Sequence, residues 1–348
     1  MAAGIEAEAF RQKLLAWYDA GRRDLPWRQS TDFYPVWISE VMLQQTRVEA
    51  AIPHYLRFLL RFPSLAALAM ADEADVLAAW SGLGYYRRAR NLHKAARQVA
   101  EAGIPRSHGE ILALPGAGPY TAAAVASIAL GLPHAAVDGN VIRVTSRLSA
   151  DSEPSESPET RRRLAALADS LLDRARPGDF NQAMMELGAT VCTPAGPQCV
   201  WCPVSGFCGG YAAGIQASLP VRHARPQSRR RELCLLLLRR KGDGGGDEVF
   251  LVRRDSGESR LAGFWEPLPY DAAWGAAPVA ANFTHQIVND RYSVSVREKW
   301  HGADSEPTVA GRWFPVADLP LVPLGGIARK AIDAVLAVRP TSLFDTGE

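Results

Sequence analysis

Apolar side chains recur along the first half of the chain at the three- and four-residue spacing of amphipathic helices. This spacing continues through successive segments between residues 5 and 185, and turn or capping residues separate the segments. Pro35 is typical of a first helical turn, and Ser107 with Glu110 three positions later forms a capping box. The pattern therefore predicts a region built only of helices.

The pattern changes to that of strands in the last third of the chain. Residues 232–240 and 248–254 flank a glycine-rich segment and predict a β-hairpin. Apolar residues alternate with polar or small ones at 292–296, and helical spacing returns at 327–338. We expect a mixed α+β fold for this region.

Length and composition allow two domains joined by a linker. With 348 residues, 47% of them hydrophobic and 22% charged, the chain can bury two separate cores. We assign residues 1–211 to an all-α domain, 212–231 to an interdomain linker rich in proline and arginine, and 232–340 to an α+β domain.

The sequence argues against secretion and membrane insertion. The N-terminal residues lack a basic segment followed by an apolar run, and the apolar stretch 233–238 is too short to span a bilayer. We expect Cys234, within that stretch, to be a buried thiol. Because the formal net charge is only +2, any contact with nucleic acid has to come from local basic patches. We expect a cytoplasmic protein.

Four cysteines lie close together with the spacing C-x6-C-x2-C-x5-C, at Cys192, Cys199, Cys202 and Cys208. Prolines and glycines interrupt this segment, so the thiolates can converge on one centre. Four cysteine ligands suit either tetrahedral zinc or an iron–sulfur cluster. Two disulfides are the alternative, which the absence of a secretion signal disfavours.

A Gly-Ala-Gly turn at Gly116 and Gly118 separates two helical stretches. We expect left-handed backbone angles in this turn, which glycine adopts readily. The amides that open the next helix would then form an anion site suited to a DNA phosphate, although an ordinary turn has the same sequence signature.

Two carboxylates are candidates for acid–base chemistry. Glu40 shares a helical face with Trp37 and Leu43, so its carboxyl should be partly desolvated and its pKa raised. Asp138 precedes a helix and should stay ionised as its N-cap. A protonated Glu beside an ionised Asp suits cleavage of a glycosidic bond through an oxocarbenium-like transition state. Taken singly, each residue is equally compatible with an ordinary surface or capping role.

A basic stripe follows an aromatic turn. Arg87, Arg90, Lys94 and Arg97 have 3-4-3 spacing along one helical face, directly after Gly-Leu-Gly-Tyr-Tyr at 82–86. Cations for phosphates and an exposed ring for insertion between bases are typical of DNA-binding surfaces. A solvated charged face with core tyrosines is the alternative interpretation.

Together these segments resemble the endonuclease III superfamily of helix–hairpin–helix DNA glycosylases. Within it, the matching segments 25–28, 37–46, 82–86 and 181–188 resemble the MutY family of adenine DNA glycosylases. The resemblance implies a [4Fe–4S] cluster on the four cysteines. It also implies double-stranded DNA as the partner of a nucleoid-associated protein, which we expect to be a monomer.

The resemblance implies a role for each matching residue. Glu40 corresponds to the acid that protonates adenine, Asp138 to the carboxylate that stabilises the sugar cation, and Asn140 to its supporting partner. Tyr120 stands where bifunctional relatives carry a Schiff-base lysine, so lyase activity is not expected. The residues expected to enclose adenine are Trp27, Arg28 and Gln182. Those expected on the side of the opposite base are Gln45, Thr46, Leu83 and Tyr85.

The second domain resembles the MutT-like (Nudix-fold) domain of the same family. Residues 261–267 match a weaker Gly-x-Trp-Glu element, and Phe283, Thr284 and His285 correspond to the loop that reads 8-oxoguanine. The Nudix catalytic motif is absent from the sequence, so this domain should bind a lesion without hydrolysing nucleotides. The implied function is monofunctional excision of adenine opposite 8-oxoguanine or guanine. The alternatives are a bifunctional endonuclease III-like glycosylase and lyase for pyrimidine lesions, and a non-catalytic iron–sulfur DNA-binding protein.

Overall fold

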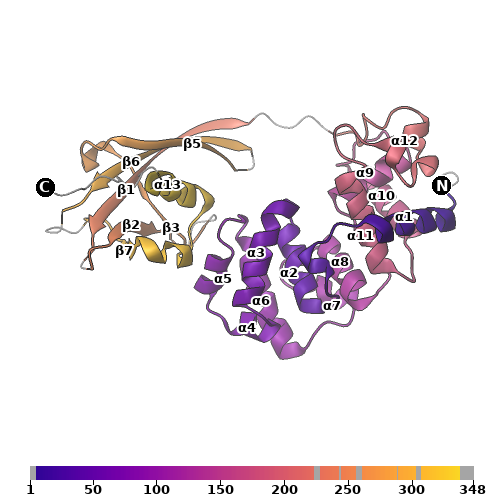
Figure 1. Ribbon diagram of the computed structural model, residues 1–348, viewed down its shortest axis with the longest axis horizontal. Coiled ribbons are helices and arrows are strands. Elements are labelled where there is room, and N and C mark those ends of the chain that lie inside the picture. The colour runs from indigo at the N-terminus through magenta and orange to yellow at the C-terminus, as the bar shows by residue number, and fades with distance from the viewer. Residues whose placement is uncertain are drawn as a thin grey trace, which may run out of the picture. The chain divides into compact units, whose positions relative to one another are not determined.

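A computed structural model describes residues 5–222, 228–242, 244–255, 261–287, 289–302 and 307–337 (Figure 1). The chain divides into two compact units. The first consists of Met1–Met70 and Asn91–Ala224, and the second of Ala71–Arg90 and Arg225–Glu348. The two-domain prediction therefore needs one change, because a short segment from the helical half belongs to the second unit.

The first unit is helical, as predicted. Its helices are α1 (Ala7–Gly21), η1 (Pro26–Arg28), α2 (Phe33–Leu43), α3 (Val48–Arg61), α4 (Leu65–Met70), α7 (His108–Leu112), α8 (Pro119–Leu130), α9 (Gly139–Leu148), α10 (Pro158–Leu171), α11 (Pro177–Thr190), η2 (Cys199–Trp201), η3 (Ser205–Phe207) and α12 (Gly209–Ala212). Helix α6 (Arg87–Ala102) begins in the second unit and continues into the first. Pro35 lies in the first turn of α2, which begins two residues earlier than expected.

Helix packing in the first unit places α2, α8, α9 and α11 together. Helix α11 packs against α1, α8 and α9, and α2 packs against α8. One core cluster includes Phe10, Val144, Leu171 and Phe180, all of them buried. The N-terminal ends of α8 and α9 and the middle of α2 and α11 therefore meet around one space.

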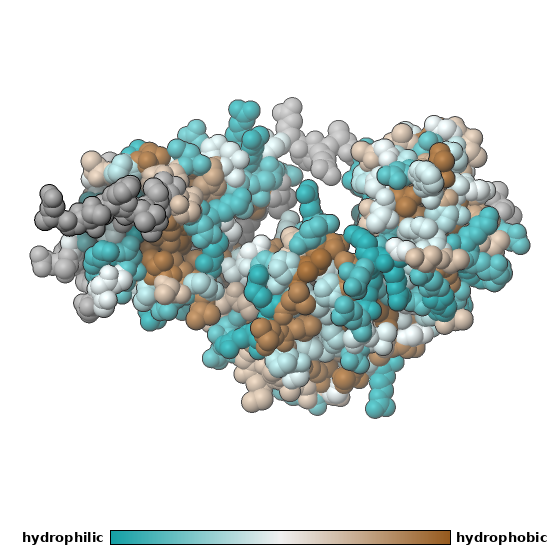
Figure 2. Space-filling view, in the orientation of Figure 1, coloured by the Kyte–Doolittle hydropathy of each residue, from teal (hydrophilic) through white to brown (hydrophobic). Residues whose placement is uncertain are grey.

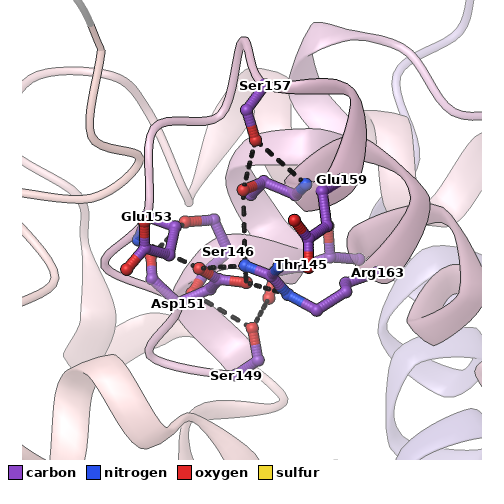
Figure 3. A network of polar contacts seen from close by, with 9 residues as sticks. Thr145, Ser146, Ser149, Asp151, Glu153, Ser157, Glu159 and Arg163 are labelled. Carbon is purple, nitrogen blue, oxygen red and sulfur yellow. Dashed lines mark hydrogen bonds and ion pairs between the residues drawn. The ribbon is translucent and has the colours of Figure 1, made fainter.

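Local hydrogen bonds fix the helix starts that the sequence predicted. Ser107 Oγ accepts from the Glu110 amide at 3.2 Å, and the Glu110 carboxylate accepts from the Arg106 amide at 2.7 Å. A second polar network holds the loop between α9 and α10 (Figure 3). There Ser157 Oγ accepts from the Thr160 amide at 3.1 Å. Arg163 pairs with Asp151 at 3.0 Å in the same network.

The second unit is an α+β fold, also as predicted. Its elements are α5 (Glu73–Ala79), β1 (Arg229–Lys241), β2 (Asp247–Arg253), β3 (Trp265–Glu266), β4 (Leu268–Pro269), η4 (Ala272–Trp274), β5 (Val279–Ile287), β6 (Asp290–Trp300), β7 (Arg312–Pro315), η5 (Val316–Leu321) and α13 (Gly326–Leu336). The strand order is β3-β2-β1-β6-β5, with β4 paired to β1 and β7 to β2. The β1–β6 pair is parallel, and β1 and β2 form the predicted antiparallel pair.

Two apolar clusters cover opposite faces of this sheet. Helix α13 lies against one face of the sheet (Figure 1). On this face Leu235 and Val294 pack with Ile332 of α13. On the other face Leu236 packs with Phe250. This alternation along β1 follows from the period of two along a strand. The helix predicted at 327–338 is confirmed as α13, although residue 338 lies outside the described residues.

The predicted linker is longer than the structure allows. Leu219 is buried, and its carbonyl accepts a 3.0 Å hydrogen bond from Arg147 Nε. The Val221 carbonyl accepts from the Ser155 amide at 2.9 Å. At the other end, β1 already begins at Arg229. The segment expected to link the domains at 212–231 therefore contributes to both units at its ends.

Hydrophilic and apolar residues are interspersed on the visible face of each unit (Figure 2). The formal net charge of the chain is only +2. Contact with a polyanion consequently has to use local arrangements of cations and helix termini. Within the described part of the chain, no helix is long and apolar enough to cross a membrane.

Candidate active site and DNA-contacting loops

A cavity of about 630 Å³ lies in the first unit, where η1, α2, α8, α9 and α11 meet. It gathers most of the residues singled out in the all-α region. Those lining the cavity are Trp27, Arg28, Glu40, Gln45, Thr46, Gly116, Gly118, Tyr120, Asp138, Asn140 and Gln182. Segments separated by up to about 150 positions in sequence thus contribute to a single concave site, which is the arrangement expected of an active site.

The Glu40 carboxyl is buried at the wall of this cavity, with 4% of the residue exposed. Burial raises the pKa of Glu40 to about 7, and the nearby charge of Asp138 acts in the same direction. The Tyr120 hydroxyl donates a 2.7 Å hydrogen bond to Glu40 Oε2, which lowers that pKa, as does Arg28. The predicted upward shift is confirmed, and a carboxyl with this pKa can donate a proton near neutral pH.

Asp138 caps α9, as predicted. Its Oδ1 accepts from the Val141 amide at 2.7 Å, and its Oδ2 accepts from Asn140 Nδ2 at 2.7 Å. Burial raises the pKa of Asp138 above its ordinary value, while these hydrogen bonds oppose the change. The expectation that capping alone sets its ionisation was incomplete, because the side chain is more buried than an exposed N-cap.

Asn140 is held by an arginine that sequence reasoning missed. Arg143 Nη2 donates to Asn140 Oδ1 and to the Gly188 carbonyl, each at 2.8 Å. Arg143 Nε donates to the Cys192 carbonyl at 2.8 Å. The Asp138 side chain is thereby positioned through Asn140 and Arg143. The signal available in the sequence was an arginine three residues after Asn140 on the same helix.

Glu186 was also missed, and it positions Arg28. Its carboxylate accepts from Arg23 and Arg28 at 2.8 Å each. Although burial acts to raise the pKa of Glu186, hydrogen bonds from these two arginines lower it to about 2. Glu186 follows Gln182 by four residues on α11, and both line the cavity. That spacing was the signal that could have found it.

Backbone strain presents Gln45 at the end of α2. Gln45 has φ of 57°, in the left-handed region, and is exposed. The neighbouring Gln44 side chain donates a 2.8 Å hydrogen bond to Thr121 Oγ1 of α8. A non-glycine residue in this conformation is sparsely populated and is found most often at functional sites.

The helix–hairpin–helix turn joins α7 to α8. Gly116 has φ of 81°, and a Cβ there would lie 2.7 Å from the Asn91 Cβ. Gly118 caps α8 with extended backbone at φ of −87°. The expectation of left-handed angles therefore holds for Gly116 and is wrong for Gly118. Pro119 follows at the first helical position, where the missing N–H is not needed.

The aromatic turn at 82–86 belongs to the second unit. Tyr85 has φ of 47° and is 51% exposed. Arg88 stacks over the Tyr85 ring at 5.6 Å and donates to the Leu83 carbonyl at 3.2 Å. Leu83 is itself buried, as is Tyr86. Of the two residues in this turn that were expected on the side of the opposite base, Tyr85 is presented to solvent and Leu83 is not.

Tyr86 fastens this turn to the strands of its own unit. Its hydroxyl donates to the Leu324 carbonyl at 2.8 Å, and its ring centroid lies 4.2 Å from that of Phe264. Along α6, Arg87 and Lys94 are exposed, whereas Arg90 pairs with Glu73 at 3.0 Å and donates to the Ala262 carbonyl. Within the basic stripe, Arg90 therefore binds groups of the protein itself, whereas Arg87 and Lys94 face solvent.

The four cysteines surround one hollow in the first unit, together with Arg147. Arg147 Nη1 lies 3.2 Å from Cys192 Sγ, at donor–acceptor distance. Among the described residues, no group of three or more His, Cys, Asp or Glu side chains is arranged to hold a single metal ion. Four thiols around one hollow are a ligand set that suits either zinc or an iron–sulfur cluster.

Phe283, Thr284 and His285 lie on the edge strand β5. Their side chains alternate between faces, so Thr284 is exposed while Phe283 packs against the α13 cluster. Thr284 and Phe283 contribute to a hollow of about 470 Å³ that also includes Cys234. Cys234 is half-buried, so the expectation of a buried thiol was wrong.

The helical hairpin and the cavity carrying Glu40 and Asp138 define a class of protein. Residues 38–169 match the HhH-GPD superfamily of base excision DNA repair proteins. The structure of a thermostable thymine-DNA glycosylase superimposes with a TM-score of 0.54 at 29% identity, covering 60% of this chain and 97% of that one.

Curated relatives narrow the class to a family. The adenine DNA glycosylase of Schizosaccharomyces pombe is 34% identical over 319 residues, which cover 75% of this chain and 69% of that protein. The adenine DNA glycosylase of Mus musculus is 41% identical over 312 residues, covering 75% of this chain and 60% of that protein. The chain belongs to the MutY-type family of adenine DNA glycosylases. It spans 60% of the length of the mouse relative.

Proposed function

We propose that this protein is a monofunctional adenine DNA glycosylase that removes adenine paired with 8-oxoguanine or guanine in double-stranded DNA. The observation that carries the proposal is the single cavity shared by Glu40 and Asp138. Two carboxyl groups in different environments are what an acid-assisted glycosidic cleavage requires. Family membership supports adenine as the base that is removed.

The chemistry follows from the two environments. A pKa of about 7 keeps a large fraction of Glu40 protonated at neutral pH, so that it can protonate the adenine ring and improve the leaving group. Asp138, fixed by Val141 and Asn140, stabilises the positive charge that develops on the deoxyribose. Arg28, oriented by Glu186, contributes to the wall that receives the extruded base.

Extrusion of the base needs contacts that offset the loss of stacking, which costs a few kcal/mol. Gln45 and Tyr85 each occupy a left-handed backbone conformation and are exposed, which supports a role on the side of the opposite base. Thr46 and the amides that open α8 after Gly118 complete this proposed DNA-contacting set. Arg87 and Lys94 are the proposed phosphate contacts along α6. Arg90 should contribute less to phosphate binding, because it is already paired with Glu73.

The cysteine hollow is the proposed site of a [4Fe–4S] cluster held by Cys192, Cys199, Cys202 and Cys208. When bound, the cluster would cross-link a loop with little regular structure and contribute folding free energy. Arg147, buried beside Cys192, would supply a hydrogen bond and positive charge toward the thiolates.

The second unit is the proposed Nudix-like domain that reads the base opposite adenine. Its exposed Thr284 supports this role, because a hydroxyl can both donate and accept hydrogen bonds. His285 lies against Gly326 with its Cε1 3.3 Å from the position that a Cβ would take there. We assign His285 and Phe283 to supporting Thr284 from the inner face of β5.

Tyr120 argues against the bifunctional alternative. It stands in the cavity where a Schiff-base mechanism needs an amine, and its phenol is engaged with Glu40. Borohydride trapping on an abasic duplex should therefore give no covalent adduct.

Measuring adenine release tests the proposal. The rate of adenine release is compared on duplexes that differ only in the base opposite adenine. It should be highest opposite 8-oxoguanine and lower opposite guanine, with essentially no release opposite thymine. Absence of release from every duplex, with binding retained, would support the non-catalytic alternative.

A further inference from the structure

Thr284 has a second hydroxyl directly across the sheet. In the register of β5 and β6, Thr284 pairs with Ser293, and in that of β1 and β6, Ser293 pairs with Glu232. The next row on the same face pairs Asn282, Ser295 and Cys234. Side chains of directly paired residues lie on one face with their Cβ atoms about 4.5–5.5 Å apart.

This face of the sheet lies opposite the one that α13 covers. The alternating residues Leu233, Phe283 and Val294 pack with the α13 cluster. The six residues of the two polar rows line the hollow of about 470 Å³, which Leu233, Phe283 and Val294 also border. Thr284 and Ser293 are both exposed within it. The unit thus presents two neighbouring hydroxyls on a floor of small and polar side chains.

Recognition of 8-oxoguanine needs two adjacent hydrogen-bonding groups of opposite type. Oxidation places an acceptor oxygen at C8 and turns N7 from an acceptor into an N–H donor. A single hydroxyl would have to serve both groups with one oxygen, donating to O8 while accepting from N7–H. Two hydroxyls on neighbouring strands can satisfy both, because one can donate to O8 while the other accepts from N7–H. Guanine lacks both features and cannot complete the pair.

We infer that Ser293 is a second specificity-determining residue for 8-oxoguanine, acting beside Thr284 on the same face of the sheet. The inference rests on the proposed function, since it concerns the base opposite the excised adenine. It adds to that function a residue on β6 whose hydroxyl hydrogen-bonds the oxidised edge of the base together with Thr284. Thr284 alone would have to bond both new groups through one oxygen, whereas Ser293 gives each group its own partner.

Ser293→Ala tests the inference, with Ser295→Ala as a matched control on the same strand and face. Binding is measured on duplexes that carry a non-cleavable adenine analogue opposite 8-oxoguanine or guanine. Loss of one hydrogen bond predicts that Ser293→Ala lowers the preference for 8-oxoguanine about 5- to 10-fold, mainly by weakening binding to the oxidised duplex. Ser295→Ala should keep the wild-type preference.

The outcomes separate the inference from the proposed function. If Ser293→Ala keeps the wild-type preference for the 8-oxoguanine duplex while Thr284→Val loses this preference, the role of Ser293 is overturned. Recognition by Thr284 would then remain intact. Equal binding of both duplexes by the wild-type protein overturns the opposite-base reading itself. Thermal unfolding of each variant shows whether the sheet is intact, and an exposed Ser-to-Ala change should leave it so.

Discussion

The Tyr120 hydroxyl donates a 2.7 Å hydrogen bond to Glu40 Oε2 across the interface of α8 and α2. This bond lowers the pKa of a carboxyl that burial has raised to about 7. Burial raises the pKa of Tyr120 well above its usual range, and the Glu40 carboxyl adds to this rise. Tyr120 therefore stays protonated and donates a hydrogen bond to Glu40 across the working pH range, tuning the acid without replacing it.

Tyr120→Phe should move the pH dependence of adenine release. The acid must be protonated, so release falls as pH rises through the Glu40 pKa of about 7. Removing a hydrogen bond that lowers this pKa raises it, and the fall should shift to higher pH. Single-turnover rates between pH 5 and 9 measure the shift. Tyr34→Phe, which removes a hydroxyl bonded to the Phe62 carbonyl, is the control and should leave the profile unchanged.

Glu40→Gln should retain binding to an adenine:8-oxoguanine duplex and lose about 10²- to 10⁴-fold in the rate of adenine release, the range typical of general acid catalysis. The amide preserves the shape and can still accept from Tyr120, but it cannot supply the proton. Rates near wild type in this variant would remove Glu40 from the acid role.

Glu186→Gln should destabilise the first unit in a pH-dependent way. The folded pKa of Glu186 is about 2, below its ordinary value, so its ion pairs stabilise the protein above pH 4.5 and lose that effect as pH falls toward 2. The variant should lose about 2–4 kcal/mol in the free energy of unfolding at pH 7. The difference from wild type should narrow at pH 3. Denaturant titrations at both pH values measure it.

A surface carboxylate provides the comparison for Glu186. Glu159 lies 3.6 Å from Arg163, with its side chain 78% exposed, so Glu159→Gln should change stability little at either pH. An equal loss of stability at pH 7 and pH 3 in Glu186→Gln would mean that its ionisation contributes nothing.

Gly116→Ala should distort the hairpin, because the added Cβ meets Asn91 at 2.7 Å and the backbone is left-handed. We expect weaker binding to duplex DNA, by about 10-fold or more, since the amides that open α8 would shift. Gly118→Ala is the matched control. Among the described residues, no atom outside its own chain neighbourhood lies within 4 Å of a Cβ at Gly118, where φ is not positive. Equal binding by both variants would argue against the hairpin as a phosphate contact.

Sequence reasoning predicted burial and capping where local signals were strong. Glu40 lies in a specific motif beside Trp37, and its burial follows from that helical face. Asp138 precedes a helix with the spacing of an N-cap. Both roles depend mainly on their own helix, so periodicity and capping rules could predict them.

The remaining features depend on tertiary partners that no local pattern encodes. Arg143 and Glu186 act through residues about 45 and 160 positions away. Leu83 was expected on the DNA-contacting surface, yet it is buried, because the turn at 82–86 packs within the second unit. That grouping of Ala71–Arg90 with the strands was not predictable from composition, which changes only after residue 211.

The central claim is that Glu40 and Asp138 act on one glycosidic bond. The most direct test is a double-mutant cycle of single-turnover adenine release, using Glu40→Gln, Asp138→Asn and the double variant. If both groups serve the same transition state, the double variant should be no more than a fewfold slower than the slower single variant. Rate losses that multiply across the two substitutions would show independent action and contradict the account.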